Sequence, residues 1–407
     1  MDAVLQGISY TFIFFTLYFE VFLLISFFEG RKKEEVTDDY TPPVTVIVPC
    51  FNEETTVLGT IESILNLEYP KENLHIMVVD DGSTDGTLKA LEVYKNHPMI
   101  EVHTKENGGK FTVLNYAIEN AKTDFVGCLD ADSFVMPDAL LRIMRKFKNP
   151  VTMAVTPSTV IHKPKNILQK MQKAEYEYGN LLRRILSIID AVHITPGPFS
   201  FFRKEVFTKI GLFKHAHNTE DMEIAMRMQK HGLKIENADG ALVYTVGPET
   251  IKKLYKQRVR WTSGFLGNLI DYKEMVFNKK YGDLGVFILP IAVVGLFVTL
   301  IFLVSNLIRF IQSLVDHILK WKTVGISMPQ FGNFEWFFLN TNTISILGLL
   351  LFFMTLFIVT YASKFTNGKW RFSIDALYFI LLYSLIAPFW LIKSVYNNLV
   401  GKHAPWR

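Results

Sequence analysis

Cysteine is scarce in this sequence, and so is net charge. The 407 residues include two cysteines, Cys50 and Cys128, both in a stretch expected below to be cytoplasmic, where thiols stay reduced. The formal net charge is only +4, and the basic residues gather beside apolar segments rather than in one stripe. Such clusters suit anionic lipid headgroups. We therefore expect no disulfide, membrane lipids as partners and no contact with nucleic acid.

Apolar residues, by contrast, are abundant and concentrated in four long runs. Hydrophobic residues make up 49% of the chain, more than one soluble domain needs. The runs at 9–28, 285–308, 343–362 and 374–392 are each long enough to cross about 30 Å of hydrocarbon. A signal peptide is the alternative for the first run, but that run lacks a basic leader and a small-residue cleavage site. We expect four transmembrane helices.

Basic residues beside these runs predict the orientation in a cell membrane. They are Arg31, Lys32 and Lys33 after the first run, Lys279 and Lys280 before the second, and Lys364, Lys369 and Arg371 between the third and fourth. The positive-inside rule places all three clusters in the cytoplasm and the N-terminus outside. Four crossings then leave Lys402, His403 and Arg407 outside, against the rule. Residues 309–322 either lie in the membrane interface or form a solvated loop helix.

The stretch from 31 to 245 alternates expected strands and helices. Short β-branched or apolar strands are expected at 44–48, 75–79, 100–104 and 125–129. Acidic and polar clusters follow the carboxyl ends of these strands, where a mostly parallel open sheet forms its ligand crevice. We predict a doubly wound α/β domain at 31–245. It follows a membrane helix at 1–30 and precedes an interfacial helix region at 246–280 and a membrane region at 281–407.

The motif Asp130-Ala131-Asp132 offers two carboxylates at the end of one expected strand. Mg²⁺ and Mn²⁺ prefer oxygen ligands, and either ion can neutralise the charge that develops on a departing diphosphate. An Asp-X-Asp pair in a loop is also a common solvated turn. Because the preceding strand is apolar, we interpret Asp130 and Asp132 as ligands for such a cation.

Two polar motifs allow both a structural and a functional interpretation. In Asp80-Asp81-Gly82-Ser83, Ser83 or the following Thr84 can cap the next helix, while Asp80 or Asp81 can accept a hydrogen bond from a nucleotide base or ribose. Lys110, after a glycine pair, is either a phosphate contact near a helix N-terminus or a surface lysine. Both functional interpretations predict a nucleotide at the strand ends.

A general base is expected in Thr219-Glu220-Asp221, at the start of a predicted helix. Acidic residues are favoured there by the helix dipole alone. However, a hydroxyl that attacks a sugar carbon must lose its proton, so a transferase needs a base within hydrogen-bond reach. We predict Asp221 for this role, with Glu220 as the alternative.

The motif from Gln257 to Trp261, with Arg258 and Arg260 inside it, lies on an amphipathic segment. One interpretation is an interfacial helix with snorkelling cations and an anchoring Trp. The other gives Arg258 or Arg260 to a diphosphate leaving group and makes Trp261 a platform for the apolar face of an acceptor sugar.

In this order the motifs resemble those of the inverting family-2 glycosyltransferases. The likeness is to the membrane-embedded processive branch that contains cellulose, hyaluronan, chitin-oligosaccharide and poly-N-acetylglucosamine synthases. It covers about residues 42–268 and begins with the segment Pro49-Cys50-Phe51-Asn52-Glu53-Glu54. The resemblance implies a GT-A fold, with Asn52 and Glu53 in the substrate site.

The resemblance also implies roles for the remaining motifs. Asp80 would contact uridine, Asp132 would ligate Mg²⁺ or Mn²⁺, Asp221 would be the base, and the motif ending at Trp261 would bind the pyrophosphate and the growing chain. The segment Pro196-Gly197-Pro198-Phe199 departs from the expected acceptor segment, which leaves the donor and acceptor unspecified. No module that would bind a cyclic dinucleotide is recognisable.

The function expected from the resemblance is processive transfer from a UDP-sugar, foremost UDP-GlcNAc, to a β-linked polysaccharide that then leaves across the membrane. A homo-oligomer or a partner subunit could complete the export path. The alternatives are a β-glucan synthase that uses UDP-glucose, a non-processive transferase with a lipid acceptor, and a transporter or scaffold without catalysis.

Overall fold

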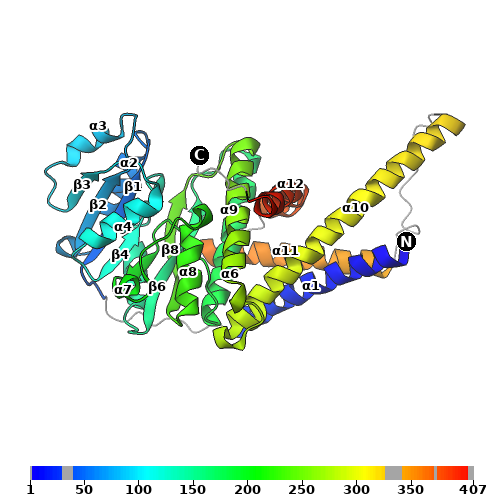
Figure 1. Cartoon of the computed structure of the whole chain (residues 1–407), viewed down its shortest axis with the longest axis horizontal. Coiled ribbons are helices and arrows are strands. Elements are labelled where there is room, and N and C mark those ends of the chain that lie inside the picture. Colours follow the sequence, from blue (N-terminus) through cyan, green and yellow to red (C-terminus); the bar gives the residue numbers. More distant parts are fainter. Residues whose placement is uncertain (1, 30–39, 326–341, 371–373, 402–407) are drawn as a thin grey trace.

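The computed structural model describes residues 2–29, 40–325, 342–370 and 374–401, and it joins an α/β unit to a group of long apolar helices (Figure 1). Several basic residues used above to predict orientation lie outside the described residues: Arg31, Lys32, Lys33, Arg371, Lys402, His403 and Arg407. Cys50 and Cys128 are both buried free thiols.

An eight-stranded sheet forms the centre of the α/β unit, in the order β3-β2-β1-β4-β7-β6-β8-β5. The strands are β1 (Val44–Cys50), β2 (Leu74–Asp80), β3 (Ile100–Thr104), β4 (Phe125–Cys128), β5 (Ser133–Val135), β6 (Thr152–Ile161), β7 (Phe201–Arg203) and β8 (Lys234–Thr245). Strands β1 to β4 pair in parallel, as do β6 and β8. β7 runs antiparallel to β4 and β6, and β5 runs antiparallel to β8. The predicted α/β fold is confirmed, and its sheet is mixed.

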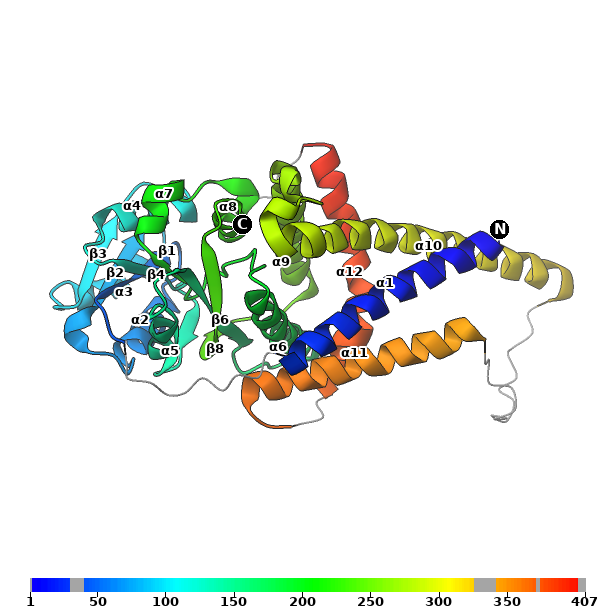
Figure 2. The same cartoon turned by 90° about the horizontal axis from the view of Figure 1, so that it is seen from below.

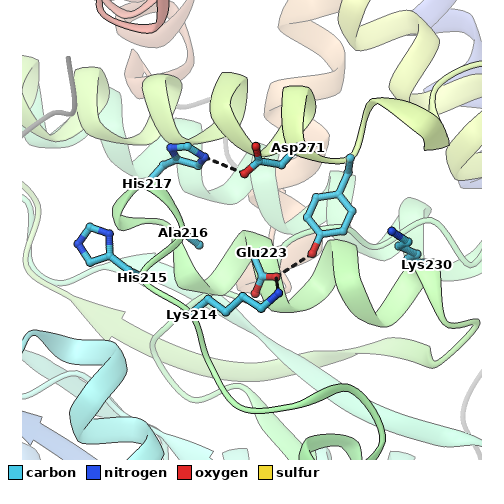
Figure 3. Close-up of a pocket in the computed structure, with 8 residues that line it drawn as sticks. Lys214, His215, Ala216, His217, Glu223, Lys230 and Asp271 are labelled. Carbon is cyan, nitrogen blue, oxygen red and sulfur yellow. Dashed lines mark hydrogen bonds and ion pairs between the residues drawn. The ribbon is translucent and has the colours of Figure 1, made fainter. Parts of the chain in front are cut away.

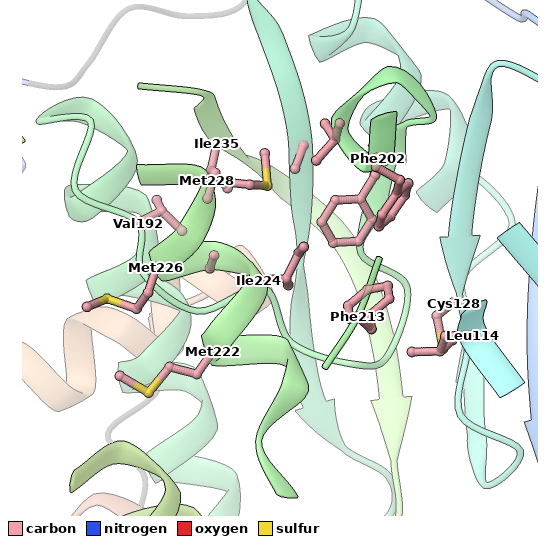
Figure 4. Close-up of a cluster of buried hydrophobic side chains, with 14 of the residues drawn as sticks. Leu114, Cys128, Val192, Phe202, Phe213, Met222, Ile224, Met226, Met228 and Ile235 are labelled. Carbon is pink, nitrogen blue, oxygen red and sulfur yellow. The ribbon is translucent and has the colours of Figure 1, made fainter. Parts of the chain in front are cut away.

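Both faces of the sheet are buried. The flanking helices are α2 (Val57–Leu65), α3 (Thr87–Leu91), α4 (Lys110–Asn120), α5 (Ala139–Lys146), α7 (Glu205–Ile210) and α8 (Glu220–Lys230), with short 3₁₀ turns at Lys71–Asn73, Glu92–Tyr94 and Ala216–Asn218. Side chains of β1 alternate between two apolar clusters: Val46 and Val48 pack in one and Ile47 in the other. Figure 4 shows α8 in the second cluster, where Ile224 and Met228 lie near Phe202 and Phe213. This packing fixes α8 against the sheet.

The helix after β2 begins later than the capping interpretation requires. α3 starts at Thr87, with Gly86 at the N-cap position and no side-chain cap. Ser83 Oγ instead accepts a hydrogen bond from Asn52 N at 2.9 Å. Thr84 N donates to Asn52 Oδ1 at 2.8 Å. The interpretation of Ser83 or Thr84 as a helix cap is therefore wrong, because these residues hold the loop after β2 against the end of β1.

In the part of the chain that the structure describes, four helices are long and apolar enough to cross a membrane, as the four apolar runs predict. They are α1 (Asp2–Glu29), α10 (Leu289–Val324), α11 (Thr343–Asn367) and α12 (Ile374–Leu399). Two further helices, α6 (Ile167–Ile188) and α9 (Ile251–Asp271), lie between the sheet and this group (Figure 1). Turns at Lys273–Met275, Lys279–Tyr281 and Leu284–Ile288 connect α9 to α10.

Residues 309–322 are part of α10. This helix continues without interruption from Leu289 to Val324, and Figure 2 shows it as one long rod. The expectation that 309–322 forms a separate helix is therefore wrong, while its location in the interface or in solvent stays a prediction. With a rise of 1.5 Å per residue, the 36 residues of α10 extend for about 54 Å, beyond the roughly 30 Å of a hydrocarbon core.

Helix α12 runs in a different direction from the other three apolar helices. Figure 1 views it nearly along its axis, and Figure 2 shows it running across α1, α10 and α11. It packs on α6 and α9. Ser394 Oγ donates to the Val259 carbonyl and Asn398 Nδ2 to the Ser263 carbonyl, both at 3.2 Å. Lys173 of α6 pairs with Asp375 at 3.3 Å. α12 thus lies alongside the helices that border the α/β unit.

Candidate active site

A cavity of about 1070 Å³ lies between the carboxyl ends of β1 and β4 and the helices α6, α8, α9 and α12. Most of the predicted site residues line it: Glu53, Asp81, Lys110, Asp130, Asp132, Glu220, Asp221, Gln257, Arg260 and Trp261. The fold therefore brings together motifs that are far apart in the sequence. Asn52, Asp80 and Arg258 do not line this cavity.

Lys110 lies inside the site and is paired. Its Nζ contacts Asp130 Oδ1 and lies 4.0 Å from Glu220 Oε1. Burial lowers the pKa of Lys110, but the Asp130 and Glu220 carboxylates outweigh burial, so that the net effect raises it. The surface-lysine interpretation is wrong. Lys110 is a fixed positive charge in the cavity wall, and its predicted contact with a phosphate stays a prediction.

The carboxylates of Asp130 and Asp132 have the chemistry that a hard cation requires. Burial, with the Asp130 and Glu53 carboxylates nearby, raises the pKa of Asp132 to about 6. Ser133 Oγ donates to Asp132 Oδ1 at 3.2 Å. Crowded carboxylates of this kind fit Mg²⁺ or Mn²⁺. Among the described residues no three His, Cys, Asp or Glu side chains form a ligand group.

Asp221 is held at the first turn of α8, facing the cavity. Thr195 donates to the Asp221 carbonyl from its N at 3.1 Å and from its Oγ1 at 2.8 Å. The side-chain Oδ1 accepts from Met222 N at 2.9 Å. Burial and the Glu220 carboxylate raise the pKa of Asp221 to about 6, against the opposing effect of Lys110 and Arg260. A base whose pKa lies near the working pH is well suited to accept a proton.

The segment that precedes Asp221 is strained. Ala216, His217 and Asn218 have positive φ values of 35°, 54° and 60°, which are uncommon for residues other than glycine. Figure 3 shows His217 paired with Asp271 at the end of α9, with an Nε2–Oδ2 distance of 2.8 Å, beside a smaller cavity of about 470 Å³. Asn268 Nδ2 of α9 donates to Thr219 Oγ1 at 2.9 Å. Helix α9 therefore fixes the loop that leads into Asp221.

The two arginines of α9 occupy different environments. Arg258 is 2% exposed, and its Nη2 contacts Glu175 Oε2 of α6 at 2.6 Å. Its guanidinium lies 4.3 Å from the ring centre of Trp261. Arg260 lines the cavity, as does Trp261, which is 37% exposed. Of the two arginines predicted to bind a leaving group, Arg260 lines the cavity and Arg258 does not. Arg258 instead packs against the Trp261 ring.

Three predicted substrate contacts instead organise loops. Asp81 accepts from Gly108 N at 3.0 Å, Gly109 N at 2.8 Å and Lys105 Nζ at 2.8 Å. Asp80 is fully buried. Its Oδ2 accepts hydrogen bonds from Gly82 N and Ser83 N, both at 3.1 Å. Its Oδ1 has no hydrogen-bond partner among the described residues. Asn52 accepts from Thr84 N, as described above. Contacts of these side chains with a nucleotide stay predictions.

One side of the cavity was missed by the sequence analysis. It is lined by α6 and α12 with these residues: Glu175, Tyr176, Tyr178, Gly179, Arg183, Phe379 and Tyr383. The spacing of Tyr176, Gly179 and Arg183 places them on one face of a helix, which is the only local signal that could have identified them. Nothing in the apolar run of α12 distinguishes Phe379 and Tyr383 from residues that face lipid.

Comparisons with known proteins identify the family of this chain. Residues 42–264 match the family described as "Glycosyltransferase like family 2". The poly-beta-1,6-N-acetyl-D-glucosamine synthase of Staphylococcus epidermidis is 30% identical over 318 residues, covering 77% of this chain and 74% of the relative. The synthase of the same name from Staphylococcus aureus strain COL is 29% identical over 310 residues, 71% of this chain and 74% of the relative.

A solved structure shares the fold over nearly the whole chain. It is a mannosyltransferase from Pyrobaculum calidifontis in complex with GDP-mannose and Mn²⁺, with a TM-score of 0.65 and 19% identity. The match covers 98% of this chain and 99% of that one. The α/β unit is thus a GT-A fold, as the motifs predict, and its likeness to the mannosyltransferase includes the long apolar helices.

Proposed function

Since this chain belongs to the glycosyltransferase-like family 2 and is a glycosyltransferase, we propose that it transfers GlcNAc processively from UDP-GlcNAc to a growing β-linked polysaccharide. The observation that carries the proposal is the cavity itself, where paired acidic side chains at the strand ends face aromatic side chains on three helices. The names of the staphylococcal relatives support both the donor and the polymer.

The reaction is a single displacement with inversion. Asp221 accepts the proton of an acceptor hydroxyl while that oxygen bonds to C1 of the sugar, and the C1–O bond to UDP breaks with its electron pair leaving on the diphosphate. Lys110 and Arg260 hold that diphosphate, because they are the cations that line the cavity near Asp221. A divalent cation bound by Asp130 and Asp132 would neutralise further charge on the diphosphate.

The acceptor end of the polymer occupies the opposite side of the cavity. Trp261 lies with its ring centre 6.5 Å from that of Tyr176, and both side chains line the cavity. Sugars present apolar C–H faces that stack on such rings. The cavity continues from there to Tyr383 of α12, so the growing chain passes towards the apolar helices. A second copy of the chain or a partner subunit completes the export path.

The direction of α12 bears on which helices cross the membrane. We infer that α1, α10 and α11 cross the cell membrane, that the α/β unit is cytoplasmic, and that α12 lies along the inner surface. Its polar contacts to α6 and α9 and its direction across the other helices support this arrangement. Three crossings also place Lys402, His403 and Arg407 inside with the other basic clusters, as the positive-inside rule requires.

The test is release of the nucleoside diphosphate, UDP or GDP, by the purified protein in detergent, with Mg²⁺ or Mn²⁺, from UDP-GlcNAc, UDP-glucose and GDP-mannose. We expect UDP-GlcNAc to be preferred and its labelled product to be a polymer that a β-1,6-N-acetylglucosaminidase digests. Preference for UDP-glucose would reject the donor and point to a β-glucan. A product with one sugar, extractable into organic solvent, would reject processivity and identify a lipid acceptor.

A further inference from the structure

One half-buried cation in the cavity has no role in the proposed reaction. Arg183 of α6 lines the cavity, and its Nη2 donates to Asn180 Oδ1 at 2.5 Å. Its Nε is buried without a hydrogen-bond partner, and no carboxylate forms an ion pair with it among the described residues. Burial lowers the pKa of Arg183 to about 10, and the nearby Tyr176 phenol only partly opposes that effect. A buried donor of a charged group without a partner is costly, so these surroundings favour an anionic ligand.

The anion of the donor does not account for Arg183. Lys110 and Arg260 are the cations near Asp221. Arg183 is contributed by α6, whereas Lys110 and the carboxylates of the donor side come from the strand ends and the first turns of α4 and α8. Assignment of the diphosphate to Lys110 and Arg260 rests on the proposed function, and with that assignment Arg183 is left for a second anionic group.

The surroundings of Arg183 describe the rest of its ligand. One face of α6 directs Tyr176, Gly179 and Arg183 into the cavity, and the neighbouring wall consists of Tyr178 and the α12 side chains Phe379 and Tyr383. Tyr178 also packs with Val359 of α11 and Ala376 of α12. The cavity thus offers one cation beside a wall of aromatic rings contributed partly by apolar helices.

We propose that Arg183 forms an anion subsite that binds the phosphate of a lipid primer, with its hydrocarbon chain along α12. The guanidinium supplies two or more N–H donors to the phosphate oxygens, including Nε, and thereby gains the counter-ion that the protein does not provide. A free phosphate would have the same head chemistry but would leave the aromatic wall unused.

The test measures binding of a radiolabelled short-chain prenyl phosphate to the full-length protein in non-ionic detergent, with the matching prenyl alcohol and inorganic phosphate as competitors. We expect the prenyl phosphate to bind at least tenfold more tightly than the alcohol. Arg183→Gln should weaken prenyl phosphate binding at least tenfold, and Arg183→Lys should restore most of it. Arg184→Gln is the matched control, because Arg184 is the next residue of α6 but pairs with Asp239 and does not line the cavity. Its binding should equal that of the wild type.

The competitors identify the source of the phosphate. Weak competition by inorganic phosphate supports a lipid, and competition as strong as that of the prenyl phosphate supports a free anion at the same subsite. The subsite would be rejected if the wild type bound the prenyl phosphate and the prenyl alcohol equally. It would also be rejected if folded Arg183→Gln bound the prenyl phosphate as tightly as the wild type. UDP release by the wild-type protein is measured separately. Its absence would reject the proposed function while leaving the phosphate-binding result intact.

Discussion

The two sides of the cavity are built from different kinds of structure. The donor side consists of strand ends and the first turn of α8, and it carries charged groups at short range, such as Lys110 with Asp130. The proposed acceptor side consists of α6, α12 and Trp261 of α9, and it carries mainly aromatic rings. The donor side can be recognised from short motifs because each carboxylate pair is contiguous in the chain. The acceptor side exists only after three helices have packed together. The predictions below separate the two sides, beginning with the largest expected effect.

Asp221→Asn should remove the base from the donor side. We expect UDP release to fall about 10²-fold to 10⁴-fold, because an amide cannot accept the proton of the acceptor hydroxyl. UDP binding, measured by calorimetry, should remain within a few-fold of the wild type. Glu220→Gln is the matched control, since Glu220 is the adjacent carboxylate that lines the same cavity. If Glu220→Gln lost more activity than Asp221→Asn, Glu220 would be the base instead of Asp221.

Acid should impair the same step through Asp221. Its pKa is raised to about 6, and the base must be ionised to act, so activity is present above this pH and is lost as the pH falls through it. We expect kcat/KM to be about tenfold lower at pH 5 than on the plateau, with a slope of one. The measurement is the pH profile of UDP release with saturating metal. A profile that stays flat down to pH 5 would contradict the assignment.

The sequence motifs specified the donor side well because strand ends in an open parallel sheet meet at one edge. Asp130, Asp132 and Asp221 were each expected there, and all three line the cavity. The choice between Arg258 and Arg260 could not be made from the sequence, because both lie on one amphipathic helix whose buried side is set by Glu175 of α6. Likewise, the apolar run of α12 has the composition of a membrane span, and only its contacts with α6 and α9 give its direction.

Glu175→Gln should weaken the acceptor side. It removes the carboxylate charge that the buried Arg258 contacts at 2.6 Å, which costs up to about 3–5 kcal/mol for a buried pair and loosens the Trp261 ring that packs on Arg258. We expect shorter products and a lower melting temperature, with a smaller loss of UDP release than Asp221→Asn causes. Product sizing on gels after equal turnover is the measurement. Glu119→Gln, on the exposed side of α4, is the control for loss of a carboxylate. If folded Glu175→Gln made products of wild-type length, the contact between Arg258 and Trp261 would not be needed for chain extension.

We expect the location of α12 in the membrane to have the smallest measurable effect on activity. It still tests the comparison directly, because the proposed acceptor side includes α12 only if this helix lies at the inner surface. Leu399 is 81% exposed at the end of α12, and Thr323 is exposed near the end of α10. We expect a membrane-impermeant maleimide to label Thr323→Cys in intact cells and to label Leu399→Cys only after lysis, while UDP release is unchanged in both. The native cysteines are buried and give the background in the wild type. If Leu399→Cys were labelled in intact cells, α12 would cross the membrane. Ser394 and Asn398 could not then keep their contacts with α9, and the acceptor side would have to be formed by other residues.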